Sequence, residues 1–298
     1  MRLVSANLMN YGSAPGEHGR DQQMAALLAE LDADVLAVQE ILASDPTEPD
    51  QPSKTELAWQ RTRRLGEALG RRCALPDGTV ACAIGGGIHH VALLWREGLT
   101  PVPDTLARFG RAGAGLWHSL VALVLDLGGV QLRVASVQLS PFSQHWGELD
   151  AAQILRALHR DTIVGVVGGD FNGVGASVVP TRDGGQSWYD PDPYTGVAWH
   201  PDHAYQLDEH GQLDRRVALR LERAGRMRDC AVLAGAPWTP TAGHHPDDRH
   251  PPRRIDRWYA SHHLPAAAVR AVDVVAEDRV GHLTDHRPVL LDLDTTAL

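Results

Sequence analysis

The sequence alternates between short apolar runs and longer amphipathic segments along its whole length. Between residues 20 and 31, Met24, Leu27, Leu28 and Leu31 recur at helical spacing, which predicts an amphipathic helix. Similar reasoning predicts helices over residues 54–69, 146–159 and 213–224. Apolar runs predict strands over residues 2–7, 34–40, 73–75, 80–84, 91–95, 117–127, 130–139, 162–167, 254–261 and 287–293. Because strands and helices mix throughout, we predict a single α/β domain over residues 1–298, with layered sheets and helices outside.

Two polar segments interrupt this pattern early in the chain, and we expect loops from Tyr11 to His18 and over residues 45–52. A longer polar segment, residues 177–210, has little periodicity, and we expect loops there that frame a cleft. Its aromatic residues are Trp188, Tyr189, Tyr194 and Trp199. Such side chains could stack a base or wall an apolar pocket, but ordinary loop packing explains them better.

One polar hexapeptide, Gly168–Gly173, directly follows the apolar run at residues 162–167. Its glycines are expected to break the strand and let the backbone approach a bound group. Asp170 and Asn172 are two residues apart, so in extended chain their side chains point to the same face. The carboxylate can take a proton or hold a water, and the carboxamide can donate hydrogen bonds. An ordinary Asp-x-Asn-Gly turn fits the hexapeptide equally well.

Polar side chains recur at the ends of other predicted strands. They are Asn7, Glu40, Gln138, Asp170 with Asn172, Asp256, and Asp285 with His286. Buried polar groups are costly unless they are paired or bind a metal, and strand ends of layered sheets converge on a cleft. Asn, Asp and Glu supply the hard oxygen ligands that suit Mg²⁺. If Asp256 and His286 do not belong to such a site, the alternative is that they form a structural pair inside a strand-rich core.

Composition narrows the class of protein. The net charge is −9, and Lys54 is the single Lys among basic residues that are otherwise Arg. Proteins that hold duplex nucleic acid tightly usually have a basic face, so this balance favours a small or transient substrate. A cluster of arginines that leads into Asp256 could grip a second phosphate or a carboxylate; its members are Arg249, Arg253 and Arg254. We find no bilayer-spanning apolar run and no signal peptide, so we expect a cytoplasmic protein without a membrane partner.

The sequence contains three cysteines, Cys73, Cys82 and Cys230, which suits reduced thiols in a cytosol. If Asp77 and Gly78 form a two-residue hairpin turn, Cys73 and Cys82 lie directly opposite each other. Free, packed thiols are the favoured interpretation over a disulfide.

Five segments together resemble the endonuclease/exonuclease/phosphatase superfamily, the deoxyribonuclease-like fold of metal-dependent phosphoesterases. They are Ser-Ala-Asn7, Leu-Ala-Val-Gln-Glu40, Gly-Gly-Asp170-Phe-Asn172, Arg-Ile-Asp256-Arg-Trp-Tyr and Thr-Asp285-His286-Arg-Pro-Val, in family order over nearly the whole chain. The resemblance implies a four-layer α/β sandwich in which two mixed β-sheets pack face to face with helices on both outer faces.

The resemblance also implies roles for individual residues. Glu40 would be the principal ligand of Mg²⁺, for which Mn²⁺ can substitute, with Asn7 and Asp285 nearby. Asp170 would orient or deprotonate the attacking water, and Asn172 would hold a phosphoryl oxygen. His286 would contact the phosphate, with its ring held by Asp256.

One position departs from the family pattern. Gln138 stands at the end of residues 130–139, where nuclease members usually have a His that acts as an acid or contacts phosphate. Gln can donate a hydrogen bond but cannot carry a proton near pH 7. Candidate replacements in space are His89, His90, His118 and His145, which the sequence cannot place.

These observations favour a Mg²⁺-dependent phosphodiesterase or nuclease-like hydrolase, or a phosphatase that acts on a small phosphorylated metabolite. A third hypothesis, which Gln138 supports, is a repurposed member that acts on a non-nucleic-acid small molecule in specialised metabolism. A fourth is a non-catalytic binding module. The expected partner is a phosphorylated small molecule or nucleic acid as a transient substrate, and no protein partner is predicted.

Overall fold

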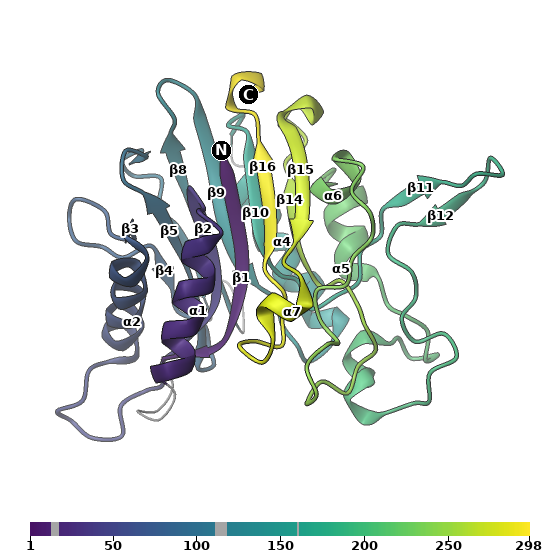
Figure 1. Cartoon of the computed structure of the whole chain (residues 1–298), viewed down its shortest axis with the longest axis horizontal. Helices are drawn as coiled ribbons and strands as arrows, with labels where there is room; N and C mark the ends of the chain where they lie inside the picture. The colour runs from purple at the N-terminus through teal and green to yellow at the C-terminus, as the bar shows by residue number, and fades with distance from the viewer. Residues whose placement is uncertain (13–17, 111–117, 160) are drawn as a thin grey trace.

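The computed structural model describes residues 1–12, 18–110, 118–159 and 161–298. The loop predicted from Tyr11 to His18 falls largely outside the described residues, as does Trp117 at the start of one predicted strand. Two mixed β-sheets lie face to face, with helices against their outer faces (Figure 1). The predicted four-layer α/β sandwich is therefore confirmed.

The first sheet is centred on a parallel pair of strands, β1 (Arg2–Tyr11) and β2 (Val35–Leu42). Antiparallel strands flank the pair: β16 (Val289–Leu293) lies beside β1, and β5 (His89–Arg96) lies beside β2. The strand order is β15-β16-β1-β2-β5-β3, and β4 also pairs with β5. The outer strands are β15 (Val269–Val274), β3 (Arg71–Arg72) and β4 (Cys82–Ala83).

The second sheet repeats this arrangement with β9 (Gln131–Gln138) and β10 (Gly165–Asp170) as its parallel pair. The antiparallel neighbours are β14 (Asp256–Ala260) beside β10 and β8 (Ser119–Asp126) beside β9. The order is β13-β14-β10-β9-β8-β6, and β7 also pairs with β8. The outer strands are β13 (Arg228–Asp229), β6 (Thr100–Pro101) and β7 (Ala107–Phe109).

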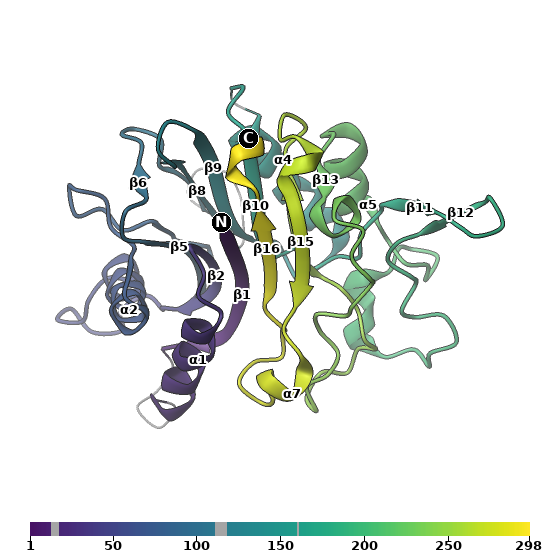
Figure 2. The same cartoon turned by 45° about the horizontal axis from the view of Figure 1, so that its top comes forward.

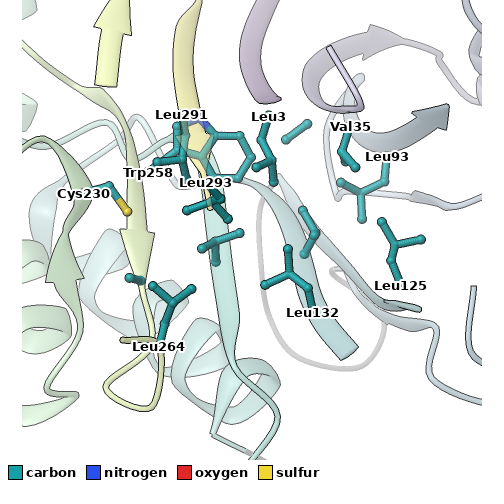
Figure 3. Packing of buried hydrophobic residues seen from close by; sticks show 14 of the residues in the cluster. Leu3, Val35, Leu93, Leu125, Leu132, Cys230, Trp258, Leu264, Leu291 and Leu293 are labelled. Carbon is teal, nitrogen blue, oxygen red and sulfur yellow. The ribbon is translucent and has the colours of Figure 1, made fainter. Parts of the chain in front are cut away.

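An apolar core fills the space between the two sheets (Figure 3). It contains Leu3, Val35, Leu93 and Leu291 from the first sheet and Leu125, Leu132 and Trp258 from the second. The indole N–H of Trp258 crosses the core and donates to the Val289 carbonyl at 3.0 Å. The inner faces of the strands are apolar, and packing them against each other removes that surface from water.

The helices cover the two outer faces. α1 (His18–Glu30) and α2 (Lys54–Leu69) pack on the first sheet, and α4 (Gln144–Leu158) and α5 (Arg216–Leu219) pack on the second. Helix α2 starts at a reciprocal capping box between Ser53 and Glu56 and ends at Gly70, whose φ is 59°. None of the helices in the described ranges has the length and apolar character needed to cross a membrane.

Several short elements were not predicted. α6 (Cys230–Leu233) and α7 (Glu277–Val280) are too short to show helical periodicity, and β15 has buried positions three residues apart, at Val269 and Val272, instead of an alternating pattern. The hairpin of β11 (Val178–Pro180) and β12 (Gln186–Trp188) projects from the body in both views (Figures 1 and 2). The remaining turns are η2 (Pro201–Gln206), η3 (Arg220–Ala224), η4 (Ala266–Ala268) and η5 (Thr295–Ala297). α5 followed by η3 forms most of the helix predicted over residues 213–224.

The cysteine hairpin differs in register from the prediction. Ala74 pairs with Val80, so the residue opposite Cys73 is Ala81 rather than Cys82. The reason is a turn that is one residue longer than the two-residue turn assumed from the sequence. All three cysteines are free and buried, as expected.

The glycines of the Gly-Gly-Asp segment have a packing role that the sequence did not reveal. The expectation that they break the strand is wrong, because β10 continues through both to Asp170. A Cβ at Gly168 would lie 2.7 Å from the Trp258 ring, and a Cβ at Gly169 would collide with the Val137 carbonyl. Glycine is therefore needed at these two positions because Trp258 and Val137 leave no room for a Cβ, and not because a bound group approaches the backbone.

We expect Gly168→Ala to lower the free energy of unfolding by about 1–3 kcal/mol, because the new methyl overpacks the indole of Trp258. The matched control is Gly19→Ala in α1, where a Cβ meets nothing within 4 Å and alanine favours the helix. Chemical denaturation of both variants measures the difference. Equal stability of Gly168→Ala and the parent protein would contradict this role.

Candidate active site

The strand directions bring the ends of eight strands to one end of the sandwich. The parallel pairs β1–β2 and β9–β10 finish there, and their antiparallel neighbours β16, β5, β14 and β8 begin there. β1 packs on β10 and β2 packs on β9 across the core. Polar residues in or next to these parts of the strands are thereby gathered at this end: Asn7, Glu40, His89, His118, Gln138, Asp170, Asp256 and His286.

Two carboxylates at this end share the same pair of amide donors. Asn7 Nδ2 lies 3.0 Å from Glu40 Oε1 and 3.4 Å from Asp170 Oδ2. Gln138 Nε2 lies at the same two distances, 3.0 Å and 3.4 Å, from the same two oxygens. Because Glu40 belongs to the first sheet and Asp170 to the second, these four side chains join the sheets through polar contacts.

A bulge in the backbone aims Glu40 toward this network. The register of the β1–β2 pair shifts after Asn7, and the β2–β5 register shifts across Glu40. Glu40 has a φ of 62°, a left-handed conformation that costs free energy for a residue with a side chain. Asn10 N donates to Glu40 Oε2 at 3.1 Å and holds the carboxylate in place. Such bulges redirect side chains near functional sites.

Asn172 holds the Asp170 carboxylate from the other side. Its backbone N–H donates to Asp170 Oδ1 at 2.9 Å, and its Nδ2 donates to Asp170 Oδ2 at 3.2 Å and to the Leu139 carbonyl at 2.9 Å. Asn172 also has a positive φ, 47°. Gln144 and Gln206 both donate to its carbonyl, at 2.7 Å and 2.9 Å, which secures this turn.

His286 is paired with Asp256, as the resemblance implied. His286 Nδ1 lies 2.8 Å from Asp256 Oδ2, and both residues are buried. Thr284 positions the ring, because its Oγ1 accepts from the His286 N–H at 3.1 Å and donates to the Asn7 carbonyl at 2.9 Å. Thr241 Oγ1 accepts from Asp256 N at 3.0 Å. Sequence reasoning did not assign roles to these two threonines, since a Thr next to a strand carries no specific signal.

A cleft of about 450 Å³ opens beside these groups. Its lining residues are Glu40, Gly87, Ile88, His89, His118, Gln138, Pro141, Phe142, Asp170, Asn172 and His286. Of the histidines considered as replacements at position 138, His89 and His118 line the cleft. His90 is fully buried behind it and contacts the Ala43 carbonyl at 3.0 Å.

Burial, neighbouring charges and hydrogen bonds shift the pKa values of Asp170, Glu40 and His286 in different directions. Burial raises the pKa of Asp170 to about 7, with Asp256 and Glu40 adding to the rise and His286 opposing it. Burial also disfavours ionised Glu40, yet His89 and the amides of Asn7 and Gln138 hold the pKa of Glu40 below its ordinary value. Burial likewise disfavours the charged ring of His286, but carboxylates led by Asp256 hold its pKa well above the ordinary value.

Residues 4–286 match the profile of the Endonuclease/Exonuclease/phosphatase family. The chain belongs to this family. Its members are hydrolases that include nucleases and phosphatases, and they generally use a divalent metal ion. A search of curated proteins found no match to the chain.

Solved structures with the same fold include other members of the family. A family protein from Leptotrichia buccalis is 16% identical over 99% of both chains, with a TM-score of 0.59. Mannosyl-6-phosphatase Bt3783 from Bacteroides thetaiotaomicron is 14% identical over 99% of both chains, with a TM-score of 0.57. Truncated TDP2 from Caenorhabditis elegans is 13% identical over 97% of this chain and 95% of that one, with a TM-score of 0.56. Identity at this level shows a shared fold.

The donor set of the cleft fits the divalent ion that family members use. Glu40 and Asp170 present carboxylate oxygens to the same point between the sheets. The buried Oε1 of Gln138 has no hydrogen-bond partner in the described part of the chain, so it is an additional oxygen available to an ion or a water. Oxygen atoms of this kind suit a hard cation.

The predicted metal ligands differ in how they face the cleft. Asn7 contacts Glu40 through Nδ2, whereas its Oδ1 accepts from the Met9 N–H at 3.0 Å. Asp285 is half-buried and lies outside the set of described residues that line the cleft. Among the described residues, Asp170, Asp256 and His286 form a group whose ligand-type atoms lie within 4.8 Å of one another. The metal-binding roles of Glu40, Asn7 and Asp285 stay predictions.

Of the two groups that the Arg cluster was expected to grip, a phosphate or a carboxylate, two of its three members hold carboxylates of the protein itself. Arg253 is buried and pairs with Asp248 at 2.8 Å, and Arg254 is buried with its Nε 2.7 Å from Asp190 Oδ1. Arg254 also pairs with Asp229. These arginines neutralise internal carboxylates and do not line the cleft.

The irregular segment at residues 177–210 supports the site from behind and does not line it. Gln206 holds the Asn172 carbonyl, whereas Trp188 and Trp199 are exposed to solvent. Tyr189 donates to the Ala236 carbonyl at 2.9 Å, and Tyr194 contacts His250 Nδ1 at 2.8 Å. The preferred interpretation, ordinary packing, holds for these two tyrosines.

The loop after Gln138 depends on a buried carboxyl group of α4. Asp150 Oδ2 accepts from the Ser140 N–H at 2.9 Å, and burial raises the pKa of Asp150 to about 7. Between the ordinary pKa near 3.8 and this value, the folded protein holds a proton that the unfolded chain releases. This group therefore makes stability fall as pH rises through that window.

We expect Asp150→Asn to remove this part of the pH dependence, because the amide stays neutral and still accepts from Ser140 through its oxygen. Denaturation of the parent and the variant at pH 5 and pH 8 measures it. The variant should gain on the order of 1–3 kcal/mol relative to the parent at pH 8. The same stability difference at both pH values would contradict this assignment.

Proposed function

We propose that the protein is a Mg²⁺-dependent phosphoesterase that hydrolyses a phosphodiester or a phosphomonoester by attack of a water that Asp170 orients. The observation that carries the proposal is the convergence of Glu40, Asp170 and His286 on one cleft of about 450 Å³. The family membership supports it, because nucleases and phosphatases of the family share this fold.

The metal would be held by oxygens of Glu40, with Asp170 and Gln138 beside it and with Asn7 and Asp285 as further predicted ligands. When bound, Mg²⁺ neutralises charge on the phosphoryl oxygens. Asp170 accepts a proton from the attacking water, and its raised pKa suits a base that works near neutral pH. Asn172 keeps the Asp170 carboxylate aimed through its two hydrogen bonds.

His286 supplies the positive charge that the phosphate meets. Its Nδ1 is taken by Asp256, so its Nε2 is the ring nitrogen left to donate to a phosphoryl oxygen. The paired carboxylate keeps the ring protonated at neutral pH. We therefore assign phosphate binding to His286 and positioning of His286 to Asp256.

A second candidate rests on Gln138. Its amide bridges Glu40 and Asp170 and cannot transfer a proton to a leaving group. A family member repurposed to act on a different small molecule in specialised metabolism would retain the metal site while losing that step.

Glu40→Gln and Asp170→Asn should each lower Mg²⁺-dependent turnover by about a hundredfold or more, since they remove a metal ligand and a base. Phosphate or nitrophenol release from p-nitrophenyl phosphate and bis(p-nitrophenyl) phosphate measures the loss, and EDTA should abolish activity. Matched controls are Glu30→Gln and Asp183→Asn, which change exposed side chains outside the cleft. Activity that survives both EDTA and Glu40→Gln would refute metal-assisted hydrolysis.

Gln138→His should raise turnover of the phosphodiester by roughly tenfold, because imidazole can protonate a leaving oxygen near pH 7. Gln138→Ala is the matched control, since it removes the amide without adding an acid. Steady-state rates with dibenzyl phosphate, whose alkoxide leaving group needs a proton, measure both variants. If histidine and alanine have the same effect, then position 138 does not limit proton transfer.

A further inference from the structure

We infer, resting on the proposed function, that the natural substrate is a small phosphoester with an apolar or aromatic group next to its phosphate. The cleft that contains Asp170 and His286 is also lined by Ile88, Pro141 and Phe142. Reactive groups and an apolar surface therefore belong to one continuous cavity. The phosphate would lie at His286 and the organic group against Ile88 and Phe142.

The apolar side chains of the cleft are unusually open to water. Ile88 is 48% exposed and Phe142 is 55% exposed, which makes them two of the exposed large hydrophobic residues of the described chain. Exposed apolar surface in a concave site is stabilised when an apolar group covers it. A volume of about 450 Å³ suits a small molecule.

Both apolar residues stand on backbone that other contacts hold in place. The Ile88 carbonyl accepts from Ala43 N at 2.8 Å, and the preceding Gly87 carbonyl accepts from Lys54 Nζ at 3.2 Å. Phe142 N donates to Ser140 Oγ at 3.3 Å, and Ser140 is bound by Asp150. A surface held in this way is largely formed before a substrate arrives, which lowers the entropy cost of binding.

The charge of the cleft argues against a nucleic-acid strand. Among the described residues that line it there is neither Arg nor Lys. Nearby cations have other partners: Lys54 pairs with Asp45 at 2.8 Å, and Arg253 and Arg254 pair with internal carboxylates. A strand with several phosphates needs several cationic contacts, whereas an ester with one phosphate does not.

The test compares benzyl phosphate with ethyl phosphate, whose leaving alcohols are of similar acidity. With Mg²⁺ present, we expect kcat/KM to be about tenfold higher for benzyl phosphate, because the phenyl ring buries apolar surface that an ethyl group does not. Phe142→Ala and Ile88→Ala should each lower kcat/KM more for benzyl phosphate than for ethyl phosphate, and so remove much of this preference. Matched controls are Trp199→Ala and Val197→Ala, exposed apolar residues outside the cleft lining.

A binding measurement keeps the inference testable apart from turnover. Calorimetric titration with benzylphosphonate and methylphosphonate should give about tenfold tighter binding of the former, and Phe142→Ala should abolish the difference. If neither these monoesters nor bis(p-nitrophenyl) phosphate is hydrolysed, the proposed function fails and the phosphonate titration alone decides the substrate class. Hydrolysis of both esters with equal kcat/KM, unaffected by Phe142→Ala, would overturn the inference while the phosphoesterase stands. A higher kcat/KM for an oligonucleotide than for benzyl phosphate would also overturn it.

Discussion

The site depends on the face-to-face contact between two parallel strand pairs, β1–β2 of one sheet and β9–β10 of the other. A buried polar link sets their alignment, because Gln39 Nε2 donates to Ser136 Oγ at 3.0 Å and Ser136 Oγ donates to the Val38 carbonyl at 3.0 Å. Most of the core between the sheets is apolar. A shift between the sheets would therefore break these hydrogen bonds and leave their buried polar groups unpaired. The link lies just before Glu40 and Gln138 in their strands, and it therefore aligns the two halves of the cleft.

The electrostatic character of the cleft follows from that alignment. Burial raises the pKa of Asp170, whereas His89 and the amides of Asn7 and Gln138 hold the pKa of Glu40 below its ordinary value, so Asp170 is the weaker acid. The positive φ of Glu40 adds conformational cost to this arrangement. The packing of the apolar core and of the two sheets offsets this cost, because it fixes the backbone around Glu40.

The larger elements of the fold could be predicted because their patterns are local. Helices α1, α2 and α4 show helical spacing, and the central strands are continuous apolar runs. β15 was missed because its buried positions do not alternate, and α6 and α7 because a single turn has no period. The glycines of β10 were misread because their neighbours, Val137 and Trp258, are distant in sequence.

For the site, the chain's own pattern identified polar residues at predicted strand ends and hence oxygen ligands and a base, and the family resemblance added a histidine paired with a carboxylate. It could not orient the amides of Asn7 and Gln138, place His118 and His89 beside them, or show that Arg253 and Arg254 point inward. Those outcomes depend on contacts between residues far apart in the chain. Residue type and local spacing follow from neighbours along the backbone, whereas side-chain direction and partner choice are settled only when the two sheets pack and exclude water between them.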